Sequence, residues 1–390
     1  MWGCRMEYIK LCDICDFQGG SQPPKDEWSF EPRDGYIRML QIRDFTQGER
    51  VTPEYIKITK TTKVCKADDI LIARYGASLG KILTGLSGAY NVAIMRTIPN
   101  TKLFEKKYLY YYLKSSTFQT FLLNIGNRAA QAGFSKKDLE ELRIPNISRE
   151  AQCEIISILE RVEAIISTRQ QQLQKLDDLV KARFVELFGD SEFNTMQWPT
   201  TELSELCNVG SSKRIYQSEQ SAEGVPFLRI SDLNERIDNV KNVPELFIPT
   251  TKYNELKEAD LVPTAGDILL TSRGTLGRCY IVRQEDEFYF QDGMISWLSD
   301  LNNQITSVYL SQLFAMSGIQ KQIASLQAGS TVAYLSISML KKLNIMLPPL
   351  DRQKQFSAFV QQTDKSKAVI QKALDEAQLL FDSLMQKYFG

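Results

Sequence analysis

Residue types that could do chemistry are sparse in this chain of 390 residues, which contains no histidine. A Ser-His-Asp or Cys-His relay, a His-ligated zinc or haem site and a histidine general base are therefore excluded. Catalysis would have to rely on carboxylates, Lys, Tyr or Cys, and a metal site would have to use carboxylates or cysteines.

Cysteines are the remaining soft ligands and nucleophiles. Cys12 and Cys15 form a C-x-x-C pair, but a zinc ribbon needs a second pair, and the sequence has none. The odd number and mostly apolar neighbours favour buried thiols in a reducing compartment. Redox chemistry and metal binding are the alternatives, and we expect no metal site. The seven are Cys4, Cys12, Cys15, Cys65, Cys153, Cys207 and Cys279.

The segment GASLGK, from Gly76 to Lys81, resembles a phosphate-binding loop at first sight. It has three residues between its glycines where a P-loop has four, and Ile82 stands where the Mg²⁺-binding Ser or Thr should be. We interpret the segment as a tight turn between strands that can present Lys81 to a backbone phosphate. The sequence also lacks an amino-methyltransferase motif, a dinucleotide-binding glycine pattern and a metal-dependent nuclease pattern. It is therefore predicted to hold no catalytic residues.

This turn belongs to a tandem repeat, because most of the second half of the chain repeats the first. Matching segments are DILIARYGASLGK with DILLTSRGTLGR, LEELRI with LKKLNI, IRMLQIRDF with VPFLRISDL, and the Phe-Gly pairs at 188–189 and 389–390. Cys12 then corresponds to Ser204 and Cys15 to Cys207, as expected of small core positions. The prolines at 145 and 348 align at a different offset from the Phe-Gly pairs, which indicates a two-residue slip in the match.

Each half reads as a mixed region of strands and helices followed by a long helix. β-branched and aromatic content predicts strands over GYIRMLQIR, DDILIARY and YNVAIMRTI, and over 224–231, 267–273 and 288–298. Helices are expected at 104–125 and 306–326. Short helices are expected to begin near Ser135, which opens a capping-box pattern with Asp138, and near Ser336.

Heptad spacing of apolar residues is sustained through 155–187 and again through 356–388. Each segment predicts a helix of ~40 residues and ~60 Å, and their equivalent places in the repeat favour mutual packing. Polar residues interrupt the two series at different positions, which could fix the register. The expected helix–helix contacts are Ile155, Leu159, Val162, Ile166, Leu173, Leu176, Val180, Leu187, Phe356, Val360, Ile370, Leu374, Phe381 and Leu384.

The formal net charge of zero hides an uneven distribution. Residues 1–147 carry 22 basic and 16 acidic residues, whereas residues 191–350 carry 13 and 18. The first region is basic enough to attract a polyanion, and the second keeps Arg273, Arg278 and Arg283 in a stretch without a carboxylate. We expect the second region to bind such a polyanion less through bulk charge and more through a few placed arginines.

The ordered set of motifs resembles the specificity (S) subunit of type I restriction–modification systems over essentially the whole chain. FQGGSQPPK and GSSKRI look like the family's entry loop, GDILLTSRGTLGR looks like its strand and glycine turn, and LNIMLPPLDRQKQF looks like its junction into the helical region. IPNISREAQ, in the first copy, departs from this junction by having one proline in place of two.

The resemblance implies an α+β fold: a tandem repeat of two mixed α/β target recognition domains, each followed by a long helix. The two helices would pack as an antiparallel coiled coil. The expected parts are recognition domain 1 (1–147), a central helical spacer (148–190), recognition domain 2 (191–350) and a C-terminal helical spacer (351–390).

The resemblance also implies function. Each domain would read one half of a bipartite target in double-stranded DNA, and the helices would set the spacing and dock two modification (methyltransferase) subunits. S-adenosylmethionine would bind to those subunits and not to this chain. Two restriction subunits, using ATP and Mg²⁺ for an ATP-dependent motor and nuclease, would join complexes that also cleave DNA.

Arginine and lysine side chains on loops are the expected DNA contacts, because they bind guanine edges and phosphates. A coiled-coil scaffold or adaptor without DNA recognition, and an enzyme with an unrecognised site, are the competing hypotheses. The candidates for DNA contact are Lys25, Arg43, Arg74, Lys81, Arg128, Ser212, Lys213, Arg214, Arg229, Arg273 and Arg278.

Membrane and export signals are absent from the pattern of apolar residues. The first ten residues lack the apolar run of a signal peptide, and no stretch reaches the ~18 apolar residues of a membrane span. A cytoplasmic location, without a membrane partner, is therefore expected.

Overall fold

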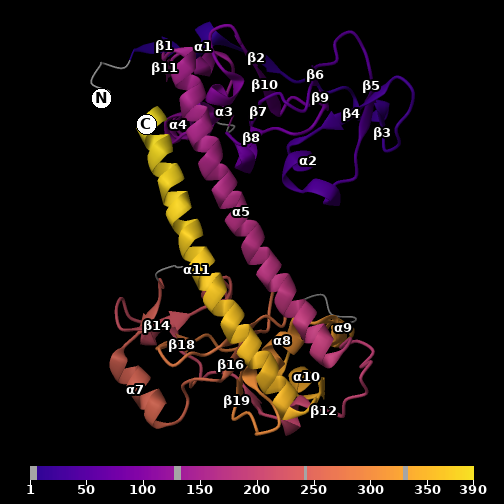
Figure 1. Cartoon of the computed structure of the whole chain (residues 1–390), viewed down its shortest axis with the longest axis vertical. Coiled ribbons are helices and arrows are strands. Elements are labelled where there is room, and N and C mark those ends of the chain that lie inside the picture. The colour runs from indigo at the N-terminus through magenta and orange to yellow at the C-terminus, as the bar shows by residue number, and fades with distance from the viewer. Residues whose placement is uncertain (1–6, 127–132, 241–243, 328–332) are drawn as a thin grey trace. The chain divides into compact units, whose positions relative to one another are not determined.

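The computed structural model describes residues 7–126, 133–240, 244–327 and 333–390. Contacts divide the chain into two compact units (Figure 1). Unit 1 comprises Met1–Gln170 and Lys372–Gly390, and unit 2 comprises Gln171–Gln371. Each unit thus combines one globular region with a part of each long helix. In the described ranges, no helix is long and apolar enough to cross a membrane.

Two larger sheets, together with a third that has only two strands (β1-β11), make up the sheet structure of unit 1, as far as the structure describes it. The first is antiparallel, with strand order β2-β10-β7-β8, and the second, of order β3-β5-β4-β9-β6, has β4 and β9 parallel. The strands are β1 (Tyr8–Lys10), β2 (Cys15–Gly19), β3 (Trp28–Ser29), β4 (Tyr36–Leu40), β5 (Tyr55–Lys57), β6 (Val64–Cys65), β7 (Leu71–Ala73), β8 (Ile82–Leu83), β9 (Gly88–Tyr90), β10 (Ile94–Pro99) and β11 (Arg143–Pro145). The short helices are α1 (Leu11–Ile14), α2 (Ile42–Thr46), α3 (Lys106–Lys114) and α4 (Ser116–Gly126).

Unit 2 repeats this plan within its described residues. Its antiparallel sheet has the order β13-β19-β16-β17, and a smaller sheet, β15-β14-β18, again contains one parallel pair. The strands are β12 (Thr200–Glu202), β13 (Asn208–Gly210), β14 (Val225–Leu228), β15 (Phe247–Ile248), β16 (Ile268–Thr271), β17 (Cys279–Ile281), β18 (Tyr289–Phe290), β19 (Ile295–Ser299) and β20 (Asn344–Met346). The short helices are α6 (Ile230–Ile237), α7 (Thr250–Glu258), α8 (Ser307–Phe314), α9 (Ser317–Leu326) and α10 (Ile337–Lys341).

Strand pairing confirms the tandem repeat and corrects one detail of it. Pro145 pairs with Tyr8 between β11 and β1, and Met346 pairs with Thr200 between β20 and β12. Pro145 is therefore the structural equivalent of Met346 and not of Pro348. The predicted two-residue slip is wrong, because it matched the prolines by type when they occupy different positions in the turn.

The predicted strands over 90–98 and 288–298 are each two strands. In unit 1, Asn91 separates β9 from β10: its side-chain Oδ1 accepts a hydrogen bond from Ala93 N (3.1 Å), which turns the chain. In unit 2 the break contains Gly293, whose φ is +68°. The first strand of each pair runs parallel to β4 or β14, so the break moves the chain from one sheet to the other.

The predicted helices over 104–125 and 306–326 are each broken once. Ser115 leaves the helical conformation between α3 and α4, and its hydroxyl donates to Tyr112 O (2.6 Å), which satisfies a carbonyl at the helix end. Ser135 opens only a 3₁₀ turn (Lys137–Leu139), with its backbone N donating to Asp138 Oδ2 (2.7 Å). Ser336 caps α10 as expected, its hydroxyl accepting from Met339 N (3.2 Å).

The two long helices are α5 (Arg149–Phe188) and α11 (Leu350–Phe389), 40 residues each, as predicted. In unit 1 the start of α5 packs with the end of α11 in a cluster that contains Leu159 and Phe389. In unit 2 the end of α5 packs with the start of α11, where Phe184 lies 5.5 Å from Phe356 between ring centroids. The helices are therefore antiparallel in each unit.

The predicted apolar series along α5 and α11 is buried or half-buried at every position. Its polar interruptions are also paired: Lys367 Nζ lies 2.7 Å from Asp177 Oδ1, and the Arg183 guanidinium lies 5.8 Å from the centroid of the Phe359 ring. The series omitted Phe184, which is fully buried. At that turn of the helix, the heptad spacing places Arg183, and not Phe184, at the predicted contact position.

Candidate nucleic-acid interface

A glycine turn joins β7 to β8 in unit 1 and β16 to β17 in unit 2, as the sequence predicts. The first and last glycines of each turn have positive φ: +70° at Gly76, +80° at Gly80, +71° at Gly274 and +78° at Gly277. These are left-handed conformations that a residue with a Cβ adopts at a cost. In unit 1, Gln119 Nε2 donates to Gly80 O (2.9 Å), so a helix side chain holds the turn in place.

Replacing Gly277 with alanine is expected to destabilise unit 2 by ~2 kcal/mol, since it adds a left-handed strain of ~1–2 kcal/mol to a steric clash. An added Cβ would lie 2.9 Å from Gln320 Nε2 and 3.0 Å from Ile323 Cδ1. At Gly274 nothing lies within 4 Å of an added Cβ, so Gly274→Ala incurs the strain alone. Denaturant unfolding of the two variants measures the difference, and equal losses would contradict this account.

An exposed tyrosine stacked with an arginine lies beside each glycine turn. In unit 1, Tyr75 forms an isolated bridge with Gly133, and the Arg74 guanidinium lies 5.0 Å from its ring centroid. In unit 2, Arg273 forms the bridge with Tyr334 and lies 5.1 Å from that ring centroid. Tyr75 and Tyr334 are 40% and 36% exposed.

The two tyrosines come from opposite sides of equivalent bridges, since Tyr75 matches Arg273 in the repeat and Gly133 matches Tyr334. Each unit therefore presents one aromatic ring and one guanidinium, although the ring comes from opposite sides of the bridge in the two units. Such pairs suit nucleic acid, because rings stack on bases and arginine binds phosphates and guanine. Sequence reasoning missed both tyrosines, and only the position of Tyr75 next to Gly76 hinted at one.

Several predicted DNA contacts are exposed and available. Lys25 precedes β3, Lys81 directly follows the glycine turn of unit 1, and Lys213 follows β13 in unit 2. All three side chains are exposed. Among the described residues, Lys25 and Lys81 form no ion pair. Arg273 is also exposed and has the Tyr334 ring as its recorded partner. Arg128 lies outside the described residues.

Other predicted contacts are already engaged within the chain. Arg43 pairs with Glu54, Arg214 Nε lies 2.8 Å from Asp292 Oδ2, and Arg74 Nε donates to Phe134 O (3.1 Å). Ser212 is 8% exposed and its hydroxyl donates to Phe290 O (2.7 Å), which gives it a structural role. We therefore place Ser212 outside the interface.

Arg229 and Arg278 are the most strongly paired of the predicted contacts. Arg229 pairs with Asp232 and Glu245. The hydrogen bond to Asp232, and after it the one to Glu245, raises the pKa of the Arg229 guanidinium. Arg278 pairs with Asp238, and its Nη1 donates to Asn234 Oδ1 (2.7 Å). Both arginines hold α6 or the segment that follows it. Each would have to give up these contacts in order to bind DNA.

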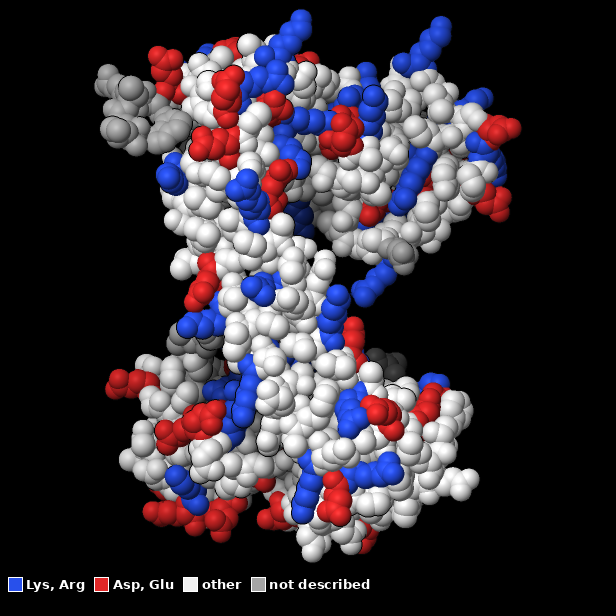
Figure 2. Space-filling model, viewed as in Figure 1, with Lys and Arg blue, Asp and Glu red and all other residues white. Residues whose placement is uncertain are grey.

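Charged side chains of both signs are mixed over the visible face of each unit (Figure 2). A surface of uniform charge is therefore not the main source of binding specificity on that face. Individually placed charged groups contribute more to it.

Two of the cysteines lie in buried environments that oppose formation of the thiolate. Burial raises the pKa of the Cys15 and Cys207 thiols to about 12, so both are protonated at neutral pH. Within the described ranges, no group of three or more Cys, Asp or Glu residues is arranged to hold a metal ion.

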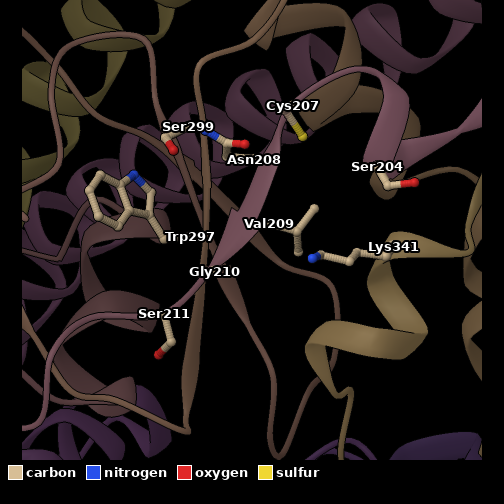
Figure 3. Close-up of a pocket in the computed structure, with 9 residues that line it drawn as sticks. All are labelled: Ser204, Cys207, Asn208, Val209, Gly210, Ser211, Trp297, Ser299 and Lys341. Atoms are coloured by element: carbon tan, nitrogen blue, oxygen red, sulfur yellow. The ribbon is translucent and has the colours of Figure 1, made fainter.

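A pocket of about 350 Å³ lies between β13, β19 and α10 in unit 2 (Figure 3). Its lining combines hydroxyls, the Lys341 side chain and Trp297, whose indole Nε1 donates to Asp267 Oδ2 (2.9 Å). The lining contains no carboxylate that could act with Lys341 as an acid–base pair. The lining residues are Ser204, Cys207, Asn208, Val209, Gly210, Ser211, Trp297, Ser299 and Lys341.

Comparison with known proteins identifies both halves. The sequence profile of the type I restriction modification DNA specificity domain matches residues 5–177 and again residues 196–378. The MjaVIII type I restriction enzyme specificity subunit of Methanocaldococcus jannaschii is 23% identical over 94% of this chain and 89% of its own length. A putative type I restriction enzyme specificity subunit of Haemophilus influenzae is 26% identical over 64% of this chain and 62% of its own.

Solved structures show the same fold. The crystal structure of the type I restriction–modification S subunit from M. genitalium superposes with a TM-score of 0.56 at 17% identity, covering 100% of this chain and 97% of that one. The duplicated profile match, the repeated sheets and the antiparallel long helices agree with one another. This chain belongs to the specificity subunits of type I restriction–modification systems, and is a non-catalytic DNA-recognition subunit.

Proposed function

We propose that each unit reads one half of a split target in double-stranded DNA, and that α5 and α11 set the distance between the halves. The observation that carries this proposal is the repeated glycine turn, which in each unit has an exposed tyrosine with a guanidinium over its ring. The same two chemical groups flank the turn of each unit, supplied from different positions of the repeat, while the surrounding loops differ: α7, for example, has no counterpart among the described residues of unit 1. Equivalent scaffolds with different loops suit the reading of two different sequences.

The long helices also offer surface for partner subunits. Large apolar side chains are exposed on both, and exposed apolar side chains mark a protein interface where they form a continuous patch. We infer that two modification subunits dock there and supply S-adenosylmethionine and adenine methylation, with two ATP- and Mg²⁺-dependent restriction subunits in cleaving complexes. The exposed apolar residues are Ile165, Leu179 and Val185 on α5, and Val369, Leu379 and Leu380 on α11.

Selection from a random duplex pool tests the proposal. The chain, assembled with its modification subunits, is incubated with the pool at low salt, and retained duplexes are sequenced. We expect enrichment of two short conserved blocks separated by a fixed number of unspecified base pairs. A scaffold without DNA recognition would retain no DNA, and a single continuous motif would contradict reading by two domains.

Salt dependence is expected to differ between the half-sites. The logarithm of the binding constant falls with the logarithm of salt concentration in proportion to the phosphates that lysines and arginines neutralise. The basic excess in residues 1–147 and the acidic excess in residues 191–350 predict a steeper slope for the half-site read by unit 1. Duplexes with one half-site scrambled provide the two slopes, and equal slopes would refute this prediction.

A further inference from the structure

A buried glutamine lies in the first turn of α11, where the helix leaves the globular part of unit 2. Gln353 is fully buried, and its side-chain Oε1 accepts a hydrogen bond from Thr306 N (2.9 Å). Its Nε2 donates to Gln304 O (2.9 Å) and to Pro348 O (2.9 Å). One side chain thus ties the start of the helix to the segment before α8 and to the segment that enters the helix.

Unit 1 contains the same arrangement at the start of α5. Gln152 is also fully buried; its Oε1 accepts from Glu105 N (2.8 Å), and its Nε2 donates to Leu103 O (3.3 Å) and Ile147 O (3.1 Å). Every partner in unit 1 is the repeat equivalent of the partner in unit 2. In the described parts of the chain, these two are the buried glutamines.

In this set of hydrogen bonds the glutamine is the one side chain whose type matters, because all its partners are backbone atoms. The partner residues differ in type between the copies: Glu105 corresponds to Thr306, and Ile147 to Pro348. The amide uses one oxygen and both N–H groups, a combination that no residue other than Gln or the shorter Asn provides. A glutamate would set its carboxylate against two carbonyl oxygens, and a methionine would leave three buried backbone groups unpaired.

We infer that Gln152 and Gln353 are positioning residues that fix each recognition domain to its outgoing helix and thereby restrict the spacing of the DNA half-sites. This inference rests on the proposed reading of a split target. One additional base pair moves a half-site by ~3.4 Å and rotates it by roughly a tenth of a helical turn. A domain discriminates against that change only if its attachment to the helix resists bending.

The test is methylation of duplexes whose half-sites are separated by the native spacer, or by one base pair fewer or more. The complete complex is used, with the chain as wild type, Gln152→Met, Gln353→Met or Gln353→Glu. For wild type we expect a strong preference for the native spacer. In the Gln variants we expect the ratio of initial rates, native over altered spacer, to fall about tenfold, as expected for loss of hydrogen bonds at one junction.

Gln174 and Gln378 provide matched controls, because they are exposed on the same helices and their side chains donate to Asp178 and Asp382, one helical turn further along. Gln174→Met and Gln378→Met should leave the ratio unchanged. The ratio does not depend on how much complex is folded, so rates that fall in parallel on all spacers would overturn the inference. Failure of the Gln353→Glu complex to assemble would also overturn it, by making the contact a folding requirement. If the wild-type complex methylates no split target, the proposed function itself fails.

Discussion

Replacing Arg273 with alanine is expected to weaken binding of the assembled complex to its target by about tenfold to a hundredfold, as loss of one good arginine–base contact predicts. Arg273 is exposed beside the glycine turn of unit 2, and its recorded partner is the Tyr334 ring. Among the described residues its guanidinium forms no ion pair, so we expect its hydrogen-bond donors to be available to DNA. Thermal unfolding of the free chain should not change, and titration of labelled target duplex measures the loss of affinity.

Arg278, five residues further on, is the matched control. Its guanidinium already binds Asp238 and Asn234, which lie at the end of α6. Arg278→Ala is expected to lower the unfolding midpoint and to leave the affinity of the folded complex nearly unchanged. Unchanged affinity and salt dependence in Arg273→Ala would remove Arg273 from the interface. If Arg278→Ala lost as much affinity as Arg273→Ala, an ion pair within the chain would not distinguish a structural arginine from one that contacts DNA.

Replacing Phe184 with alanine is expected to destabilise the chain by ~3–5 kcal/mol, the usual cost of removing a buried phenylalanine. The ring is fully buried at the end of α5 in unit 2. It stacks on Tyr309 with centroids 5.5 Å apart and an interplanar angle of 13°, and it contacts Phe188 and Phe356 at 4.9 and 5.5 Å. The variant therefore loses ring contacts with α11 and α8 and one within α5, and chemical denaturation measures the resulting loss of stability.

Val185 supplies the comparison at the adjacent position. Its side chain is 49% exposed on α5, and Val185→Ala should change stability by no more than ~0.5 kcal/mol. Loss of assembly with the modification subunits in this variant, at unchanged stability, would support docking on the helices. A small effect of Phe184→Ala would mean that the aromatic cluster is not a core and would undermine the antiparallel packing in unit 2.

Periodic features were predictable from sequence because they depend on local spacing. The heptads gave both 40-residue helices, and the repeated segments gave the paired sheets. Strand breaks were not predictable in the same way. Apart from Asn91, residues 90–98 are strand-like in type, and the turn at Asn91, which transfers the chain between sheets, divides them.

Side-chain availability was the least predictable property. Arg273 and Arg278 look alike in the sequence, yet Arg278 is bound by Asp238, 40 residues earlier, while Arg273 forms no ion pair within the part of the chain that the structure describes. Ser212 looked polar and accessible in GSSKRI, but its hydroxyl bonds to Phe290 O, 78 residues away. Pairings at such separations depend on the fold and leave no local signal.

Methylome sequencing of a host with and without this chain tests the central claim most directly. The account predicts a bipartite motif, two short blocks with a fixed gap and methylated adenines, that is present with the chain and disappears when the chain is deleted. The partner subunits must be expressed in both hosts, so that the chain is the only difference. Persistence of the same motif without the chain, or no motif that depends on it, would contradict the account.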